Sequence, residues 1–406
     1  MEKLIQPFLA LRPHPQLAES VIAPPYDVLN DSEARVMVQN KPNSFLHISK
    51  PQVDLSDSID PYSEVVYQKG KDNFEKLKSG GVLVRDTVPC FYIYRIERDG
   101  HQQTGVSCVA SVEAYDSNII KKHELTRPQK EDDRVKQISS LKAQTGPVLL
   151  VHKKSSEIKE TISLLSNSPP DYRVVSNDGN VHSLWVINNP SYIDQIASNF
   201  NNLDQLYIAD GHHRSAAASR VAKFMKNNNS AQFFLSVIFP EDELQILPYN
   251  RLIKSLNGLS PQELLNHIGK SFNVSVSQKQ FQPENKQQFG MYLEGKWYKL
   301  SFKKNITNNN PVSSLDVSIL HDEIIKPLLG IIDPRIDPSI DFVGGVRGLK
   351  ELSDKVDSGK MQLAFSLFST HVKELMLVAD SNKIMPPKST WFEPKLVDGL
   401  ISHMLD

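Results

Sequence analysis

The sequence predicts a mixed α/β (α+β) protein. Short apolar runs at 147–152 and 206–210 are typical of buried strands, and the stretches at 63–77 and 155–166 are typical of helices. Strand and helix signals follow one another along all 406 residues without an internal repeat. At about 100–200 residues per domain, this length predicts two or three domains.

Composition excludes several classes of protein. The 46 Lys and Arg residues nearly balance the 47 Asp and Glu residues, which argues against a general nucleic-acid coat. No run approaches the roughly 18 apolar residues of a membrane span, and the first residues lack the apolar run of a signal peptide. With only two cysteines, Cys90 and Cys108, we expect reduced thiols and a cytoplasmic protein.

Residues 1–115 are expected to form an N-terminal mixed α/β part. The two prolines at 24–25 stiffen an extended segment, because each proline restricts the residue before it. A helix is predicted over 63–77. A hairpin is predicted over about 90–115, since Arg-Asp-Gly-His at 98–101 is a turn signal between two apolar runs.

Residues 116–255 are expected to form a phosphate-binding core. It begins with a charged stretch that belongs on a surface or in a cleft. Strands and helices then alternate. The predicted strands are 147–152, 181–186, 206–210 and 233–239, and the predicted helices are 155–166 and 212–226.

Residues 256–406 are expected to form a C-terminal α/β part with a closing tail. We predict an Asn-rich turn at 305–310 and a helix over 313–328. A strand, glycines and a helix follow over 340–356, and two last strands are predicted at 362–368 and 375–378.

The most informative motif is Asp-Gly-His-His-Arg at 210–214. An apolar strand ends in Asp210, Gly211 allows a tight turn, and His212, His213 and Arg214 begin a helix. The N–H groups and dipole of a helix start attract anions, and an arginine there can bind a phosphate through two hydrogen bonds. Asp210 is placed to hold Mg²⁺ or accept a proton. A plain strand–glycine–helix connection remains the alternative, and zinc is less expected because adjacent histidines rarely reach one metal.

A second motif is the charged run at 121–134. Lys122, Arg127, Lys130 and Arg134 could neutralise a polyphosphate. The carboxylates that could bind the accompanying metal or act as the base are Glu124, Glu131, Asp132 and Asp133. The alternative is a solvated helix surface, which is the usual meaning of such runs.

Two weaker candidates lie further along the chain. Arg347 sits in a second strand–glycine–helix turn, and residues 385–395 form a stiff tail that either closes over a site or fixes the chain to the core. The sequence contains no phosphate-binding P-loop, no dinucleotide fingerprint and no nucleophile elbow.

These motifs together carry a resemblance to a known family. The chain resembles the domain-of-unknown-function family 1015 in six segments that occur in order: 23–28, 122–134, 210–214, 247–251, 344–348 and 385–395. The turn at 210–214 is also similar to the Gly-x-x-Arg turn of the ParB/sulfiredoxin-like nucleotide-binding module. That module occurs in an archaeal ADP-dependent kinase of free serine. The resemblance implies a ParB/sulfiredoxin-like core with N- and C-terminal α/β additions.

The resemblance also implies an activity in serine metabolism. It points to a kinase that phosphorylates the hydroxyl of L-serine with pyrophosphate, or with ADP or ATP, and that uses Mg²⁺ held by Asp210. Glu124 is the first candidate for the base, and Asp210 is the second. His212 and His213 complete the expected catalytic group, and Gly211 and Arg214 are expected to bind the donor phosphate with them. Asp27 and Arg347 are candidates for binding serine. No nucleic acid or membrane partner is expected.

Two other functions stay open at this point. One is a nucleotide-sensing regulator without turnover. The other is a hydrolase of phosphoesters or nucleotides, which would use the same cations with water as the acceptor.

Overall fold

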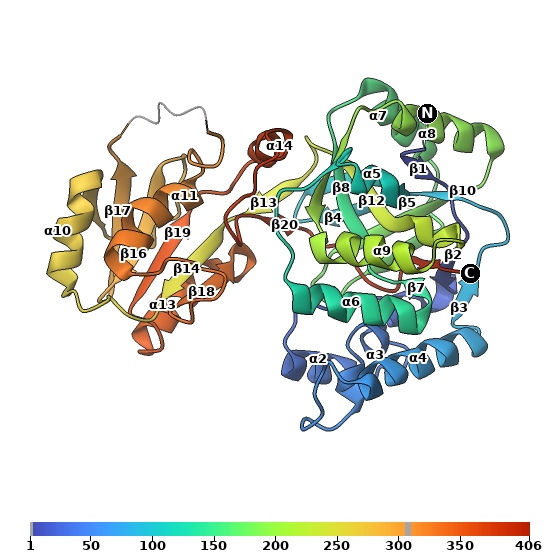
Figure 1. The fold of residues 1–406 in the computed structure, drawn as a ribbon, viewed down its shortest axis with the longest axis horizontal. Helices are drawn as coiled ribbons and strands as arrows, with labels where there is room; N and C mark the ends of the chain where they lie inside the picture. Colours follow the sequence, from blue (N-terminus) through green and yellow to red (C-terminus); the bar gives the residue numbers. More distant parts are fainter. Residues whose placement is uncertain (1–2, 305–309) are drawn as a thin grey trace. The chain divides into compact units, whose positions relative to one another are not determined.

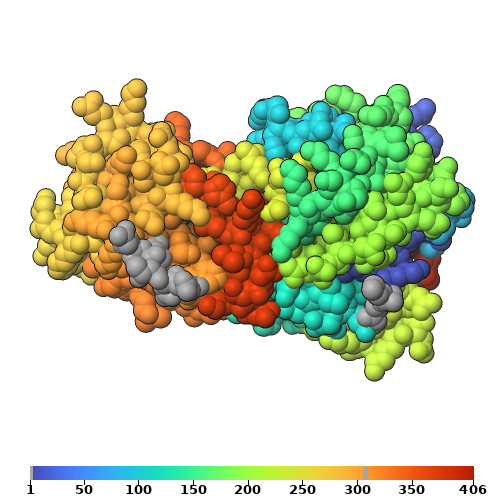
Figure 2. All heavy atoms as spheres, turned by 90° about the horizontal axis from the view of Figure 1, so that it is seen from above, coloured from blue at the N-terminus to red at the C-terminus, as the bar shows by residue number. Residues whose placement is uncertain are grey.

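The computed structural model describes residues 3–304 and 310–406, and the other residues are grey in Figure 1 and Figure 2. Residues 305–309 of the predicted Asn-rich turn therefore lie outside the described part. The chain divides into two compact units. Unit 1 comprises Met1–Leu244 and Pro394–Asp406, and unit 2 comprises Gln245–Glu393. Each unit combines helices with sheet, which confirms the predicted mixed α/β class.

A mixed sheet forms the centre of unit 1. Among the described residues it has nine strands. In order across the sheet they are β6 (Ile120–Lys121), β11 (Leu206–Asp210), β8 (Val148–His152), β12 (Phe233–Pro240), β5 (His101–Ser111), β4 (Phe91–Arg98), β10 (Val181–Ile187) and β9 (Tyr172–Val175), with β1 (Ile5–Gln6) also paired to β5. The β4–β5 hairpin turns between Arg98 and His101, as the sequence predicts. Cys90 and Cys108 are free thiols, also as predicted.

Helices cover this sheet because their apolar faces match its strands. The core includes Ile158 and Ile162 of α7 (Ser156–Leu165) and Phe200 of α8 (Pro190–Asn201). It also includes Val112 of α5 (Val112–Asp116) and Ala218 of α9 (His212–Phe224). The small side chains of α9 bring that helix close to the sheet, and α9 runs beside α6 (Pro128–Leu141) (Figure 1).

A second, smaller sheet completes unit 1. Its order is β3 (Leu83–Arg85), β2 (Ala10–Pro13), β21 (Ser402–Met404) and β7 (Ala143–Gln144). Its apolar residues share a core with the N-terminal helices α1 (Ala18–Val21), α3 (Leu46–Ser49) and α4 (Glu64–Ser79). The helix α2 (Asp31–Val38) begins with a capping box formed by Asn30 and Glu33. Strand β21 lies between β2 and β7, so a segment from the far end of the sequence is a central strand here.

Unit 2 is built on an antiparallel sheet of six strands within the described residues. Their order is β15 (Phe272–Ser277), β17 (Lys296–Phe302), β16 (Gln288–Leu293), β19 (Leu363–Leu367), β14 (Tyr249–Ile253) and β18 (Ile340–Gly344). The first and last segments of unit 2 also pair with each other, as the antiparallel strands β13 (Gln245–Leu247) and β20 (Trp391–Glu393). The helices α10 (Pro261–Ser271) and α13 (Gly348–Asp357) belong to this unit.

The domain division differs from the predicted one. The predicted boundary at 115/116 falls inside one sheet, because β5 pairs with β12 from Phe233↔Ser111 to Ile238↔Val106. The crossing to unit 2 comes at Leu244, somewhat before the predicted 255, and residues 394–406 return to unit 1. Local sequence patterns reveal neither the β5–β12 pairing nor the return of residues 394–406 to unit 1. Both bring together segments that are distant in the sequence.

Two element predictions in unit 2 also need correction. The predicted strand at 375–378 is part of a helix, α14 (Val372–Asp380), which starts at a capping box between His371 and Glu374. The predicted helix over 313–328 begins later and is interrupted. It consists of α11 (Asp316–Leu320), a π-helical turn η4 (His321–Ile325) and α12 (Lys326–Leu329). No described helix is both long enough and apolar enough to cross a membrane.

Candidate anion and metal site in unit 1

The Asp-Gly-His-His-Arg motif forms a turn between β11 and α9. Gly211 has a φ of +100°, a conformation that side-chain-bearing residues rarely adopt. A Cβ atom at this position would lie 3.2 Å from Arg214 Nε and 3.3 Å from Val148 Cα. Glycine is therefore required both for the turn and for its close packing. The first backbone N–H groups of the helix that follows have no hydrogen-bond acceptor within the helix, so they can donate to a bound anion.

Two histidines join this turn to the charged segment. The backbone N–H of His123 donates to His212 Nε2 at 3.5 Å, and the backbone N–H of Arg127 donates to His213 Nε2 at 3.0 Å. On the helices that follow, Arg220 of α9 pairs with Glu131 of α6 at 2.9 Å. The two motifs singled out in the sequence are thus brought together.

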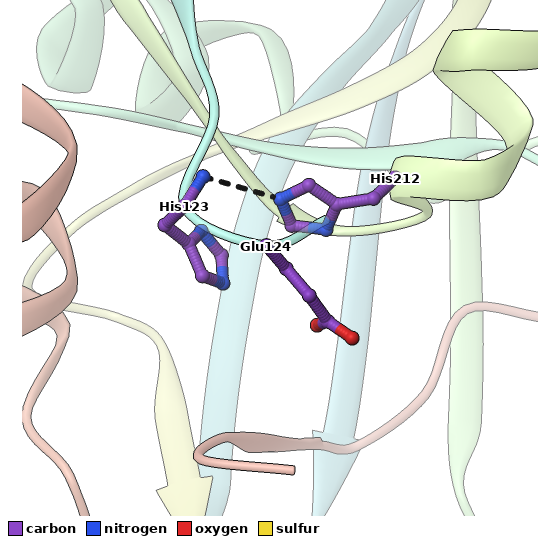
Figure 3. A group of neighbouring side chains, drawn as sticks. All are labelled: His123, Glu124 and His212. Carbon is purple, nitrogen blue, oxygen red and sulfur yellow. Dashed lines mark hydrogen bonds between the residues drawn. The ribbon is translucent and has the colours of Figure 1, made fainter. Parts of the chain in front are cut away.

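His123 and His212 are buried against each other (Figure 3). Their ring centroids are 4.4 Å apart and their planes are perpendicular. Among the described residues, neither ring nitrogen of His123 has a hydrogen bond of good geometry. Burial lowers the pKa of His123 to about 4, and burial together with His123 lowers the pKa of His212 well below its usual value. Both imidazoles are therefore neutral at pH 7. Glu124 lies beside them, and one potential ligand atom from each of the three residues lies within 4.8 Å of the others.

Asp210 is held by cations. Lys395 Nζ donates to Asp210 Oδ2 at 2.9 Å, and Arg214 lies 3.8 Å from Oδ1. Burial alone would raise the pKa of Asp210, but Lys395 and Arg214 hold it well below its usual range. An ionised carboxylate with two cationic partners is a poor proton acceptor at neutral pH. This arrangement argues against Asp210, the second candidate for the base.

A small cavity of about 30 Å³ lies next to the turn, and its lining includes Arg134, Arg214, Tyr26 and Asp398. The Arg134 guanidinium stacks on Tyr26 at 3.8 Å and donates to Asp133 at 2.8 Å. Arg214 donates to a backbone carbonyl, that of Pro147. Burial raises the pKa of Asp398 to about 7, although Arg214 and Arg134 act against that shift. Two predicted phosphate-binding arginines therefore line one cavity.

Lys395 and Asp398 are site residues that sequence reasoning missed. Lys395 was part of the tail motif at 385–395, but nothing local showed that it pairs with Asp210. Asp398 reaches the site because its backbone bridges to Ala23, with Ala23 N–H donating to Asp398 O at 3.1 Å. That bridge joins the motif at 23–28 to the returning segment. No signal in the sequence alone points to this pairing.

The remaining predicted residues lie in different surroundings. Lys122 Nζ lies 3.9 Å above the Tyr115 ring, and burial lowers the pKa of Lys122. Lys130 Nζ donates to Tyr62 Oη at 3.0 Å. Asp27 is exposed on unit 1.

Electrostatics connects Asp27 to the site. Burial would lower the pKa of Arg214, but Asp210 and Asp27 raise it. Arg347 belongs to unit 2, on the short helix η5 (Gly345–Arg347).

The site is a poor match for a resident Mg²⁺ ion. Mg²⁺ requires near-octahedral coordination by oxygen and usually keeps several waters. Asp210 offers one carboxylate that already accepts from Lys395 and faces Arg214. The group of potential ligands that the described residues do bring together, His123, Glu124 and His212, supplies two imidazoles. Asp210, which was predicted to hold Mg²⁺, is therefore poorly suited to bind that ion as a permanent cofactor.

Solved structures similar to this chain include a free serine kinase in complex with AMP (12% identity, 70% of this chain and 86% of that chain, TM-score 0.36). They also include C-terminally truncated SbnI from Staphylococcus aureus (10% identity, 72% of this chain and 85% of that chain, TM-score 0.39). A third is a conserved hypothetical protein from Pyrococcus furiosus (13% identity, 72% of this chain and 93% of that chain, TM-score 0.35). TM-scores this low do not establish a shared activity.

Comparison at the level of sequence gives the family. No curated protein matches the sequence. A family model matches residues 5–318, which is well over half of the 406 residues and includes the charged segment and the Asp-Gly-His-His-Arg turn. The chain therefore belongs to the family described as "Protein of unknown function (DUF1015)".

Proposed function

We propose that this protein is a kinase of free L-serine that uses pyrophosphate as the phosphoryl donor. The products would be O-phosphoserine and orthophosphate. The observation that carries the proposal is the junction at the start of α9, where the turn at 210–214 is tied to the cation-bearing segment by His212 and His213. The acceptor is taken from the motif resemblance, which points to serine metabolism.

The donor would bind at the helix start. Backbone N–H groups of the first turn of α9 provide a site for one phosphate, and the guanidinium groups of Arg134 and Arg214 lie at the adjoining cavity. Phosphoryl transfer proceeds mainly through positioning and charge stabilisation, so such an arrangement suits the reaction. Mg²⁺ would enter with pyrophosphate, as part of the substrate.

Glu124 would act as the general base. It would accept the proton of the serine hydroxyl while the serine oxygen forms a bond to the terminal phosphorus. The bond between that phosphorus and the bridging oxygen would break, and orthophosphate would leave with the electron pair. Asp27 would bind the serine ammonium group.

Pyrophosphate is favoured over a nucleotide for two reasons. It concentrates up to four negative charges in a small volume, and the guanidinium groups of Arg134 and Arg214 line one cavity beside the start of α9. The sequence also lacks the P-loop and dinucleotide fingerprints. Because the similar free serine kinase structure contains AMP, ADP is the second donor to test.

The decisive experiment measures phosphoserine formation from serine with Mg²⁺ and pyrophosphate, ADP or ATP. We expect kcat/KM with pyrophosphate to be at least about tenfold higher, a difference of ~1.4 kcal/mol in transition-state stabilisation. Glu124→Gln should lower kcat by about 10²-fold or more. Arg220→Ala, on α9 and paired with Glu131, is the matched control and should retain activity.

Each other outcome has a defined meaning. A preference for ADP or ATP would overturn the donor but keep the kinase. Release of orthophosphate from pyrophosphate or a nucleotide without phosphoserine would indicate a hydrolase. Nucleotide binding without any turnover would indicate a regulator.

A further inference from the structure

The side chain of His123 is buried, and its two ring nitrogens lack a hydrogen bond of good geometry within the described part of the chain. Its residue is 2% exposed. Leaving buried polar atoms unsatisfied destabilises the folded protein, so native proteins rarely do so without a ligand, an ion or a water. His152 has one such nitrogen, but its other nitrogen contacts the Lys153 carbonyl oxygen at 2.7 Å. His123 therefore indicates a missing binding partner at this position.

Two other metal-ligating side chains converge on the same place. His212 comes from the first residue of α9, 89 positions along the chain, and Glu124 follows His123 directly (Figure 3). One potential ligand atom from each residue lies within 4.8 Å of the others. The 3.5 Å contact of the His123 N–H with His212 Nε2 is at the outer limit of a hydrogen bond, so a better partner can replace it.

We propose that His123, Glu124 and His212 bind one divalent first-row transition-metal ion of the class that includes Zn²⁺, Co²⁺ and Mn²⁺. Two imidazole nitrogens and one carboxylate oxygen are ligands that such ions share, whereas Mg²⁺ and Ca²⁺ prefer oxygen alone. Zinc ligands lie about 2.0–2.2 Å from the ion, so modest side-chain rotations would bring the three atoms to ligating positions.

Three protein ligands would leave coordination positions open. In structural zinc sites four protein ligands are usual, and three with an open position are typical of sites that bind water or substrate. Because the set lies beside the first turn of α9, an oxygen of a bound anion could occupy an open position. Metal binding itself does not depend on the proposed kinase activity.

Metal binding is tested without serine or any phosphate donor. The full-length protein is stripped with a chelator and titrated with Co²⁺, whose visible absorption reports imidazole coordination, and with Zn²⁺ by calorimetry. We expect one ion per chain, and a large excess of Mg²⁺ should not displace it. His123→Asn and His212→Asn should each weaken the affinity by about 100-fold or more. Glu124→Gln should weaken it by about 10-fold or more.

His152→Asn is the matched control. It also removes a buried histidine with an unsatisfied nitrogen, and it should leave the affinity unchanged. The proposal is overturned if the wild-type protein binds no Co²⁺ or Zn²⁺. It is also overturned if the His123 and His212 variants unfold at the wild-type temperature and bind these ions normally. If the histidine variants do not fold, an unchanged affinity in Glu124→Gln, whose side chain is only half-buried, overturns it instead.

Discussion

Arg214 shows how burial changes the role of a motif residue. In the sequence it begins a polar helix and is expected to reach a phosphate. In the structure its side chain is 12% exposed, donates to the carbonyl of Pro147 and faces Asp210. It therefore contributes to folding as well as to any anion bound nearby, and a loss of activity on its removal cannot be assigned to catalysis alone.

We expect Arg214→Ala to lower both stability and turnover. The Pro147 carbonyl and Asp210 would each lose a donor or charge partner, which costs about 1–3 kcal/mol for a buried group. Urea unfolding measures this loss. Arg220→Ala, on the same helix but with partly exposed partners, should change stability by only ~0–1 kcal/mol. Equal stabilities of the two variants would contradict the buried role of Arg214.

Arg134 and Lys130 belong to the same charged segment but should respond differently to removal. Arg134→Ala leaves the carboxylate of Asp133 buried without its cation, so we expect a loss of about 3–5 kcal/mol. Lys130→Ala removes one contact with Tyr62 on a partly exposed side chain and should cost about 1 kcal/mol or less. Thermal and urea unfolding of both variants test this contrast. Two silent variants would mean that the whole segment is a solvated surface.

Asp398 should make stability depend on pH. Its pKa of about 7 in the folded protein is above its ordinary value near 4, so the folded state keeps a proton that the unfolded state has released. The stabilisation is therefore complete below about pH 4 and is lost as the pH rises through about 7, at ~1.4 kcal/mol per pH unit. Urea unfolding across this range should show the slope in the wild type relative to Asp398→Asn. Parallel curves would disprove it.

At the scale of elements, local patterns predicted most of unit 1 but less of unit 2. Strands β8, β11 and β12 and helices α7 and α9 were predicted because each has an apolar period or run with clear breakers. The run in α14 was predicted as a strand because Leu375, Met376 and Val378 are apolar in a short window. Its helix depends on the cap at His371, which short apolar runs do not reveal.

The candidate site was predictable only where its residues are close in sequence. The turn at 210–214 and the segment at 121–134 are contiguous motifs, and the structure brings them together. The pairs His123–His212, Asp210–Lys395 and Ala23–Asp398 join residues that are far apart in sequence. Neither spacing nor composition carries information about these pairs, because they result from the packing of the completed unit.

The turn between β11 and α9 should be sensitive to any added side chain. In Gly211→Ala a Cβ atom meets Arg214 and the Val148 backbone at a positive φ, so we expect a loss of about 1–3 kcal/mol or more together with lower activity. Gly179→Ala is the matched control, since Gly179 has a φ of +83° but open space around it. A greater loss at Gly179, measured by urea unfolding, would contradict the close packing inferred at Gly211.

At the scale of the whole molecule, the chain leaves unit 1 after Leu244 and re-enters it at Pro394. Unit 2 has its own antiparallel sheet and its own apolar core, which includes Leu252, Trp297 and Leu352. Its stability should therefore depend little on unit 1.

A protein consisting of residues 245–393 alone should fold. We expect native-like circular dichroism and one cooperative urea transition, because the sheet and core of this unit are internal to the fragment. Residues 1–244 alone should not reach a native state, since β21, Lys395 and Asp398 would be missing. A stable, cooperative fragment 1–244 would show that the returning segment is dispensable.

The return of residues 394–406 has a consequence for the order of events on the ribosome. Strand β21 fills the place between β2 and β7, and Lys395 and Asp398 complete the site, yet all of them are translated about 150 residues after Leu244. Unit 2 can fold while unit 1 still waits for its last strand. A nascent chain that stalls before residue 394 would expose the gap between β2 and β7 to chaperones and proteases. Only chains translated past this point would acquire the site.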